Sequence, residues 1–135
     1  MAYRVYLVDD DRFLLDLYAV KFRKAGHEAT AFGGGEELLA ALRKEGTISP
    51  DAILIDLIMP GMGGFETLEA IRKEHLAKGS KIIILSNQGQ DSDLERAKQL
   101  SVDGYIIKAS AIPSEVLAQT ISTIEAGAPK PSVPH

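Results

Sequence analysis

Five short apolar runs, separated by longer segments with helical spacing, limit the folds open to this chain. Most of the runs are continuously apolar and rich in β-branched or aromatic residues, which is typical of strands buried on both faces. The runs are residues 5–8, 29–32, 53–55, 82–85 and 105–107. The helical segments are residues 12–25, 35–44, 64–74, 91–100 and 113–126. Strict alternation of this kind predicts an α/β fold with a doubly wound parallel sheet and helices on both faces.

Local signals give these helices expected ends and sides. Gly26 is placed to end the first helix, and Pro113 suits the first turn of the last one. Leu94, Ala97 and Leu100 stand at helical spacing in the fourth helix. In the first helix, the residues expected to lie largely along one side are Phe13, Leu14, Leu17, Val20 and Phe22.

Length and composition narrow the class of protein. The chain has 135 residues, 45% of them hydrophobic, so one domain with its own core is expected. A net charge of -4 excludes the basic footprint of a nucleic-acid-binding domain. The chain has no cysteine, which excludes disulfides, thiolate metal sites and cysteine nucleophiles.

The two ends of the chain indicate its location and its domain boundary. The N-terminus leads straight into a strand-like run with no room for a signal peptide, and no apolar run approaches membrane-spanning length. A cytoplasmic protein without a membrane partner is therefore expected. Residues 127–135 read GAPKPSVPH, so we expect a domain over residues 1–126 followed by a Pro-rich tail or linker.

Polar side chains follow four of the five apolar runs. Asp9 and Asp10 follow the first run, and Asp56 follows the third. Ser86 follows the fourth run and Lys108 the fifth. Because ligands of open parallel sheets bind at the carboxyl ends of the strands, we expect these side chains to gather in one crevice.

The charges in this crevice indicate metal and phosphoryl chemistry. Three neighbouring carboxylates repel one another, and a hard cation such as Mg²⁺ relieves that repulsion. Three carboxylates, the Lys108 ammonium and one Mg²⁺ sum to zero charge, and a phosphoryl group of about -2 on Asp56 leaves about -1. Lys108 and Ser86 can bind its oxygens. Asp56 precedes a loop with Pro60 and several glycines, so we expect its carboxylate to lie on a tight exposed loop, where it can attack phosphorus.

Four stretches together carry a resemblance to a known family. They are Val8-Asp9-Asp10-Asp11, Asp56-Leu57-Ile58-Met59-Pro60-Gly61, Ile84-Leu85-Ser86-Asn87 and Gly104-Tyr105-Ile106-Ile107-Lys108. In order and spacing, they are similar to the CheY-like receiver domain of two-component response regulators, over about residues 3–126. The resemblance implies a flavodoxin-like three-layer sandwich with strand order 2-1-3-4-5 and five helices.

The resemblance also implies a role for each residue of the crevice. Asp56 would accept a phosphoryl group from a partner sensor histidine kinase. Asp9, Asp10 and Asp56 would bind Mg²⁺, with Asp10 favoured as the direct ligand, and the main-chain carbonyl of Ile58 would complete the metal site. Asp11 is expected mainly to cap the following helix.

Other residues would bind the phosphoryl group and report its presence. Lys108 and Ser86 would hold the phosphoryl oxygens. Tyr105 would turn inward as Ser86 moves, and the face made by the fourth helix, fifth strand and fifth helix would change. The domain would act as a signalling switch rather than an enzyme. A downstream effector or fused output domain would be its partner, without direct contact to nucleic acid.

Four positions depart from the pattern common in this family or flank its reaction path. Ala109 stands where proline is frequent, which disfavours a cis peptide there. Asn87 replaces a frequent alanine and could narrow access to the crevice. Ile58 and Gln88 flank the path of an attacking water, and our hypothesis is that apolar Ile58 excludes water and prolongs the phosphorylated state.

Three alternatives stay open on the sequence alone. Asp9-x-Asp11 also resembles the nucleophile motif of haloacid-dehalogenase-like phosphatases, in which Asp9 would be modified in place of Asp56. A flavin-binding module of similar topology is disfavoured, because the acidic first loop would repel a phosphate. A pseudo-receiver would be a scaffold that is not phosphorylated.

Overall fold

The computed structural model describes residues 2–44, 46–87, 89–108 and 111–126, and it contains five strands and five helices in strict alternation. The strands are β1 (Arg4–Val8), β2 (Glu28–Phe32), β3 (Ala52–Ile55), β4 (Lys81–Ser86) and β5 (Gly104–Ile107). The helices are α1 (Arg12–Lys24), α2 (Gly35–Arg43), α3 (Gly64–Lys73), α4 (Asp91–Gln99) and α5 (Pro113–Ala126). The elements expected from the sequence are confirmed, and every end lies within one residue of its predicted position.

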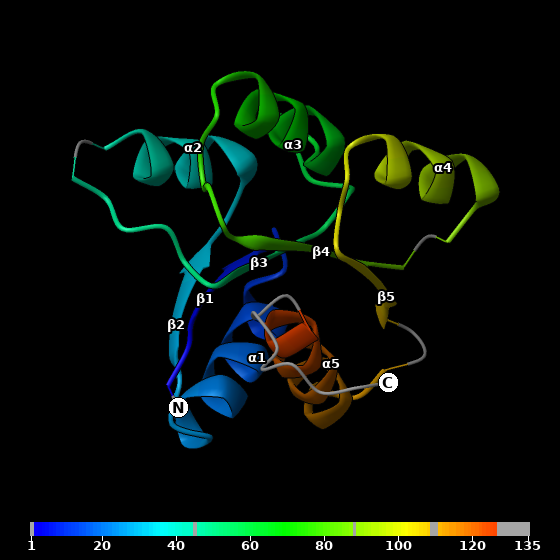
Figure 1. Cartoon of the computed structure of the whole chain (residues 1–135). Coiled ribbons are helices and arrows are strands. Elements are labelled where there is room, and N and C mark those ends of the chain that lie inside the picture. Colours follow the sequence, from blue (N-terminus) through cyan, green and yellow to red (C-terminus); the bar gives the residue numbers. More distant parts are fainter. Residues whose placement is uncertain (1, 45, 88, 109–110, 127–135) are drawn as a thin grey trace, which may run out of the picture.

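All strands run parallel in the order β2-β1-β3-β4-β5, which confirms the predicted fold. Helices α1 and α5 cover one face of the sheet, and α2, α3 and α4 cover the other (Figure 1). Strand β3 is apolar throughout because both of its faces are buried. Ile53 and Ile55 pack on the α2–α3 side, whereas Ala52 and Leu54 pack on the α1–α5 side. Two apolar clusters, one on each face, therefore hold the sheet in the middle layer.

Only part of the predicted apolar side of α1 faces the sheet. Phe22 is buried and Leu14 packs against the core, as expected, but the other three residues do not. Phe13, Leu17 and Val20 are exposed to 72%, 42% and 47%. The residues that pack on the sheet are Leu15, Tyr18, Ala19 and Phe22. Both sets have helical spacing, because α1 is apolar over most of its circumference. The spacing alone could not decide which side faces the sheet.

Helix α4 is the most weakly buried of the helices. Ala97 is its only buried residue, and Leu94, which the spacing placed on an apolar side, is 39% exposed. No helix in the described ranges is long and apolar enough to cross a membrane. The expected Pro-rich tail, residues 127–135, lies outside the described residues, so the domain boundary stays a prediction.

Candidate functional site

The carboxyl edge of the sheet brings together the predicted polar residues because four adjacent strands end there in register. Val8 pairs with Ile55, so Asp9 and Asp56 each stand one residue beyond a paired position. The backbone N–H of Asp56 donates to the Val8 carbonyl at 3.0 Å, which extends the ladder to this residue. Ser86 pairs with Ile107, and Lys108 follows directly.

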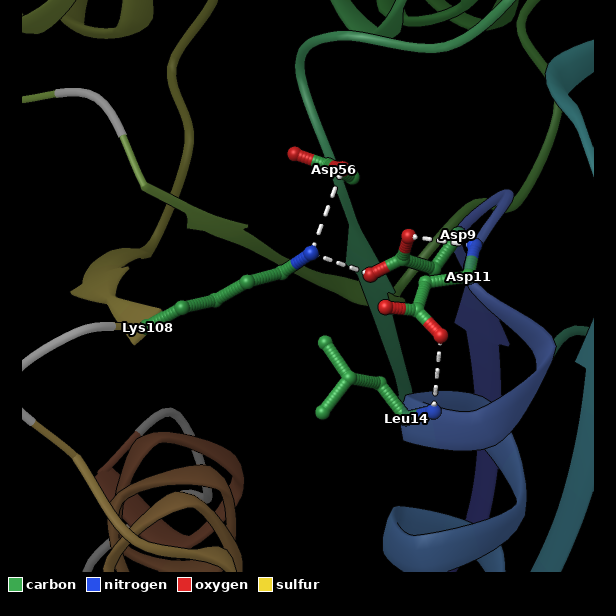
Figure 2. A network of polar contacts seen from close by, with 5 residues as sticks. All are labelled: Asp9, Asp11, Leu14, Asp56 and Lys108. Carbon is green, nitrogen blue, oxygen red and sulfur yellow. Dashed lines mark hydrogen bonds and ion pairs between the residues drawn. The ribbon is translucent and has the colours of Figure 1, made fainter.

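Lys108 joins the two strand ends through its ammonium group. Its Nζ donates to Oδ2 of Asp9 and to Oδ2 of Asp56, the latter at 3.2 Å (Figure 2). The side chains of Lys108, Asp9 and Asp56 are only 7%, 5% and 11% exposed, so the expectation of an exposed Asp56 carboxylate is wrong. A buried cation between two buried carboxylates is strongly coupled to them, because water screens these charges poorly.

Burial and this ion pair change the acidity of both partners of the contact. Burial raises the pKa of Asp56 above its ordinary value, although the Lys108 charge acts in the opposite direction. Burial lowers the pKa of Lys108, but the hydrogen bond to Asp9 and the charge of Asp56 outweigh it, and the net pKa is raised. Lys108 therefore stays a cation near neutral pH.

Asp10 adds a third carboxylate to Asp9 and Asp56. One carboxylate oxygen from each of the three residues lies within 4.8 Å of the others, and Asp10 is exposed whereas the other two are buried. Oδ1 of Asp9 already accepts the N–H of Asp11 at 3.0 Å, and its Oδ2 binds Lys108. Among the residues that the structure describes, none binds the Asp10 carboxylate, so Asp10 is the best placed to bind a cation directly. An all-oxygen set of this kind fits Mg²⁺.

Asp11 caps helix α1, as expected. Asp11 is the N-cap of α1, and its Oδ1 accepts the N–H of Leu14 at 3.2 Å (Figure 2). Capping satisfies one of the unpaired N–H groups in the first turn of α1. Asp11 therefore fixes the start of the helix, while Asp9 and Asp10 line the crevice.

The loop after Asp56 is packed tightly against its own backbone. The N–H of Gly64 donates to the Leu57 carbonyl at 2.9 Å, and a Cβ on Gly64 would lie 2.3 Å from the Asp56 carbonyl oxygen. Only glycine fits this approach. A backbone hydrogen bond from Ile58 reaches the Asp56 carboxylate and favours its ionised form. The Ile58 side chain is 58% exposed, and metal binding by its carbonyl stays a prediction.

The two expected switch residues lie on β4 and β5. Ser86, the last residue of β4, is 1% exposed, and Tyr105 is half-buried on β5 opposite Ile84. Burial raises the pKa of the Tyr105 hydroxyl, as do the nearby charges of Asp93 and Asp56. Tyr105 is therefore electrostatically coupled to the phosphoacceptor position, and its role as a switch stays a prediction.

Three further positions around the crevice were singled out in the sequence. Asn87 is exposed, and Gln88 and Ala109 lie outside the described residues.

Tyr18 was not predicted to lie near the charges of the crevice. It is 4% exposed on α1, and burial raises the pKa of its hydroxyl while the Lys108 charge opposes that change. Its helical spacing with Leu15 and Phe22 was the only signal in the sequence, and it indicated core packing.

Comparison with known proteins identifies this arrangement. A model of the response regulator receiver domain family matches residues 5–121. The DNA-binding response regulator MtrA of Mycolicibacterium paratuberculosis is 29% identical over 119 residues, covering 88% of this chain and 50% of MtrA. Protein PilH of Pseudomonas aeruginosa is 27% identical over 124 residues, covering 92% of this chain and 98% of PilH. The chain thus spans about half the length of MtrA and most of PilH.

Solved structures agree with the sequence comparison. A CheY-like receiver domain protein from Methanospirillum hungatei has a TM-score of 0.81 and 25% identity, covering 93% of this chain and 96% of its own. The Vibrio cholerae chemotaxis protein CheY4 has a TM-score of 0.80 and 25% identity, covering 91% and 99%. The likeness therefore extends over nearly the whole described domain.

Proposed function

Because the chain belongs to the response regulator receiver domain family, we propose that Asp56 accepts a phosphoryl group from a phospho-histidine of a partner kinase. The observation that carries this proposal is the buried Asp9–Lys108–Asp56 network at the carboxyl edge of the sheet. The family match leaves no support for the phosphatase and flavin-binding alternatives. The pseudo-receiver alternative is decided by whether Asp56 is modified.

The proposed transfer needs little beyond positioning and charge neutralisation. An oxygen of Asp56 attacks the phosphorus, the bond from phosphorus to the histidine nitrogen breaks, and the imidazole leaves. Lys108, now held by Asp9 and Asp56, can bind a phosphoryl oxygen, and Ser86 can donate to another. Lys108 and Asp56 are both buried, so the positive charge of Lys108 is in place before the phosphodonor arrives.

Asp9, Asp10 and Asp56, with the main-chain carbonyl of Ile58, would hold Mg²⁺. When bound, the ion supplies positive charge to the phosphoryl oxygens. The chain itself assists only its own phosphorylation and dephosphorylation, as a signalling switch rather than an enzyme acting on other substrates. The output face would be α4, β5 and α5, which would bind an effector or a fused output domain. A cytoplasmic location stays a prediction.

Removal of the exposed carboxylate is expected to abolish metal binding. Mg²⁺ at ten times its dissociation constant should stabilise the native protein by about 1.4 kcal/mol. Asp10→Asn should lose most of this gain in thermal unfolding with and without Mg²⁺. Asp16→Asn, an exposed aspartate on α1, is the control and should keep it. An unchanged Mg²⁺ effect in Asp10→Asn would remove Asp10 from the metal site.

Ile58 is exposed beside Asp56, where it can cover the phosphoryl group against water. Ile58→Asn should shorten the lifetime of the phosphorylated protein by about three- to tenfold, equivalent to roughly 0.7–1.4 kcal/mol of barrier. The loss of phosphoryl signal after donor removal measures this. Ile48→Asn, which changes an equally apolar residue that is 70% exposed, should leave the lifetime unchanged. A lifetime that does not shorten in Ile58→Asn contradicts the water-exclusion hypothesis.

A further inference from the structure

Helix α4 rests on the sheet with little apolar contact. Ala97 is its only buried residue. Beside it, a largely apolar open groove of about 310 Å³ lies between α4 and β5, and Leu94, Val102 and Tyr105 are among the residues that line it. Because few apolar groups hold α4 against β5, its position depends on other contacts.

The first of these contacts is made by Arg96, in the second half of α4. Its Nη2 lies 3.0 Å from Oε1 of Glu69 on α3. The same guanidinium stands 4.6 Å from the centre of the Phe65 ring, also on α3. Arginine can make both contacts at once, because its planar group pairs with a carboxylate and stacks on an aromatic face.

The second contact is made by Arg72 of α3 at the C-terminal end of α4. Its Nε donates to the Leu100 carbonyl at 3.0 Å, and its Nη2 donates to the Ser101 carbonyl at 3.1 Å. Leu100 is the C-cap of α4, so Arg72 binds carbonyls that the end of a helix leaves unpaired. Figure 1 shows α3 and α4 side by side on the same face of the sheet.

All these contacts are made in the C-terminal half of α4 or at its C-cap. Asp93, in the first turn, has a buried Oδ2 with no hydrogen-bond partner among the described residues. The Asp93 charge acts on Tyr105, and so does the charge of Asp56. None of the α3 contacts described above reaches the N-terminal half of α4.

We propose that Glu69, Arg72, Arg96 and Phe65 form a latch that holds α4 against α3 in the unphosphorylated chain and thereby limits the share of molecules with a switched output face. The latch deepens the proposed receiver function and rests on it. The C-terminal half of α4 is the pivot, and phosphorylation moves the N-terminal half against the latch. The ligand-free population of the switched state is then set partly by the strength of these α3–α4 contacts.

The test uses the full chain without a phosphodonor and compares the Glu69–Arg96 ion pair with an ion pair at the C-cap of α3. Glu69→Gln and Arg96→Gln each break the latch. Arg43→Gln and Glu74→Gln break a matched exposed pair, in which Arg43 of α2 binds Glu74 at 2.5 Å. Amide hydrogen exchange of α4, followed by mass spectrometry, should become about three- to tenfold faster in the latch variants, since exposed pairs of this kind are individually weak. The control pair should leave α4 exchange unchanged.

Two further readouts separate the latch from general loosening of the fold. Arg96→Gln should accelerate α4 exchange more than Glu69→Gln does, because it also loses the Phe65 contact. The double variant should show the same exchange rate as Arg96→Gln alone. Phosphorylation by acetyl phosphate with Mg²⁺ should accelerate by a similar factor in the latch variants. Unchanged α4 exchange in both latch variants, or equal acceleration in the controls, overturns the proposal. If wild type takes up no phosphoryl group, the receiver function fails instead, and the exchange result still decides whether the contacts hold α4.

Discussion

Asp56→Asn is expected to abolish phosphorylation by acetyl phosphate and Mg²⁺, whereas wild type gains the mass of one phosphoryl group. The amide keeps the size of the side chain, but it lacks the anionic oxygen that attacks phosphorus. Asp56 is buried beside Lys108, and its pKa is raised by burial, so the native side chain also has an environment in which neutralisation is tolerated. The variant should therefore stay folded, and intact-mass spectrometry gives the answer directly.

Two other aspartates make this experiment decisive. Asp16→Asn on α1 should be phosphorylated as wild type is, because its side chain is exposed on the helix and is not part of the Asp9–Asp10–Asp56 cluster. Modification that persists in Asp56→Asn and disappears in Asp9→Asn would instead identify Asp9 as the nucleophile. An absence of mass gain in wild type, with every donor tried, would leave the chain as a scaffold with a receiver fold.

The fold and the strand-end residues could be predicted because their signals are local. A run such as Ile53-Leu54-Ile55 is apolar on both faces only if helices cover both sides of a sheet. Once the strands are parallel, the residue after each strand is brought to the same edge, so Asp9, Asp56 and Lys108 meet without any tertiary information. The order of the strands came from the resemblance, since alternation alone permits other orders.

The sequence did not predict which side of a helix packs on the sheet where two sides are equally apolar, nor the contacts between distant helices. Helix α1 is apolar on more than one side, and the side with Leu15 and Tyr18 is the one that packs with β1 and α5. The burial of Tyr18 follows from this packing. Arg72 contacts the end of α4, and Arg96 contacts Glu69 on α3. These contacts join residues that are far apart in the sequence, and no spacing rule indicates them.

The ion pairs of Lys108 offset part of the repulsion between the carboxylates before phosphorylation. Formal charges of three carboxylates and one ammonium leave an excess of two negative charges on the metal-free site, and Lys108 is placed between the two buried carboxylates rather than beside the exposed one. The lysine thus stabilises the empty site as well as the phosphorylated one. Its removal should affect folding and phosphorylation together, and the two effects can be separated.

Lys108→Met is expected to slow phosphorylation by about 10²–10³-fold, the range seen when one pre-positioned charge or donor at a reacting oxyanion is removed. In metal-free buffer it should also lower the free energy of unfolding by about 3 kcal/mol, because Asp9 and Asp56 stay buried without their cation. Added Mg²⁺ should restore part of the stability, since a second cation can take over the pairing. Lys81→Met is the control. It removes a longer ion pair, between Lys81 and Asp103 at 3.8 Å, and should lower the free energy of unfolding far less.

The pH dependence of this stability loss distinguishes an uncompensated charge from a packing defect. Lys108 lowers the pKa of Asp56, so in Lys108→Met that pKa rises further above the value in the unfolded chain. A folded-state pKa above the unfolded one means that the folded protein binds the proton more tightly, and stability then increases as pH falls through that pKa. The stability difference between wild type and Lys108→Met should therefore be largest at neutral pH and shrink in mildly acidic buffer, as measured by urea unfolding in chelator. A difference that stays constant with pH would mean that the methionine disturbs packing, and that the two carboxylates are not held in place by the charge of Lys108.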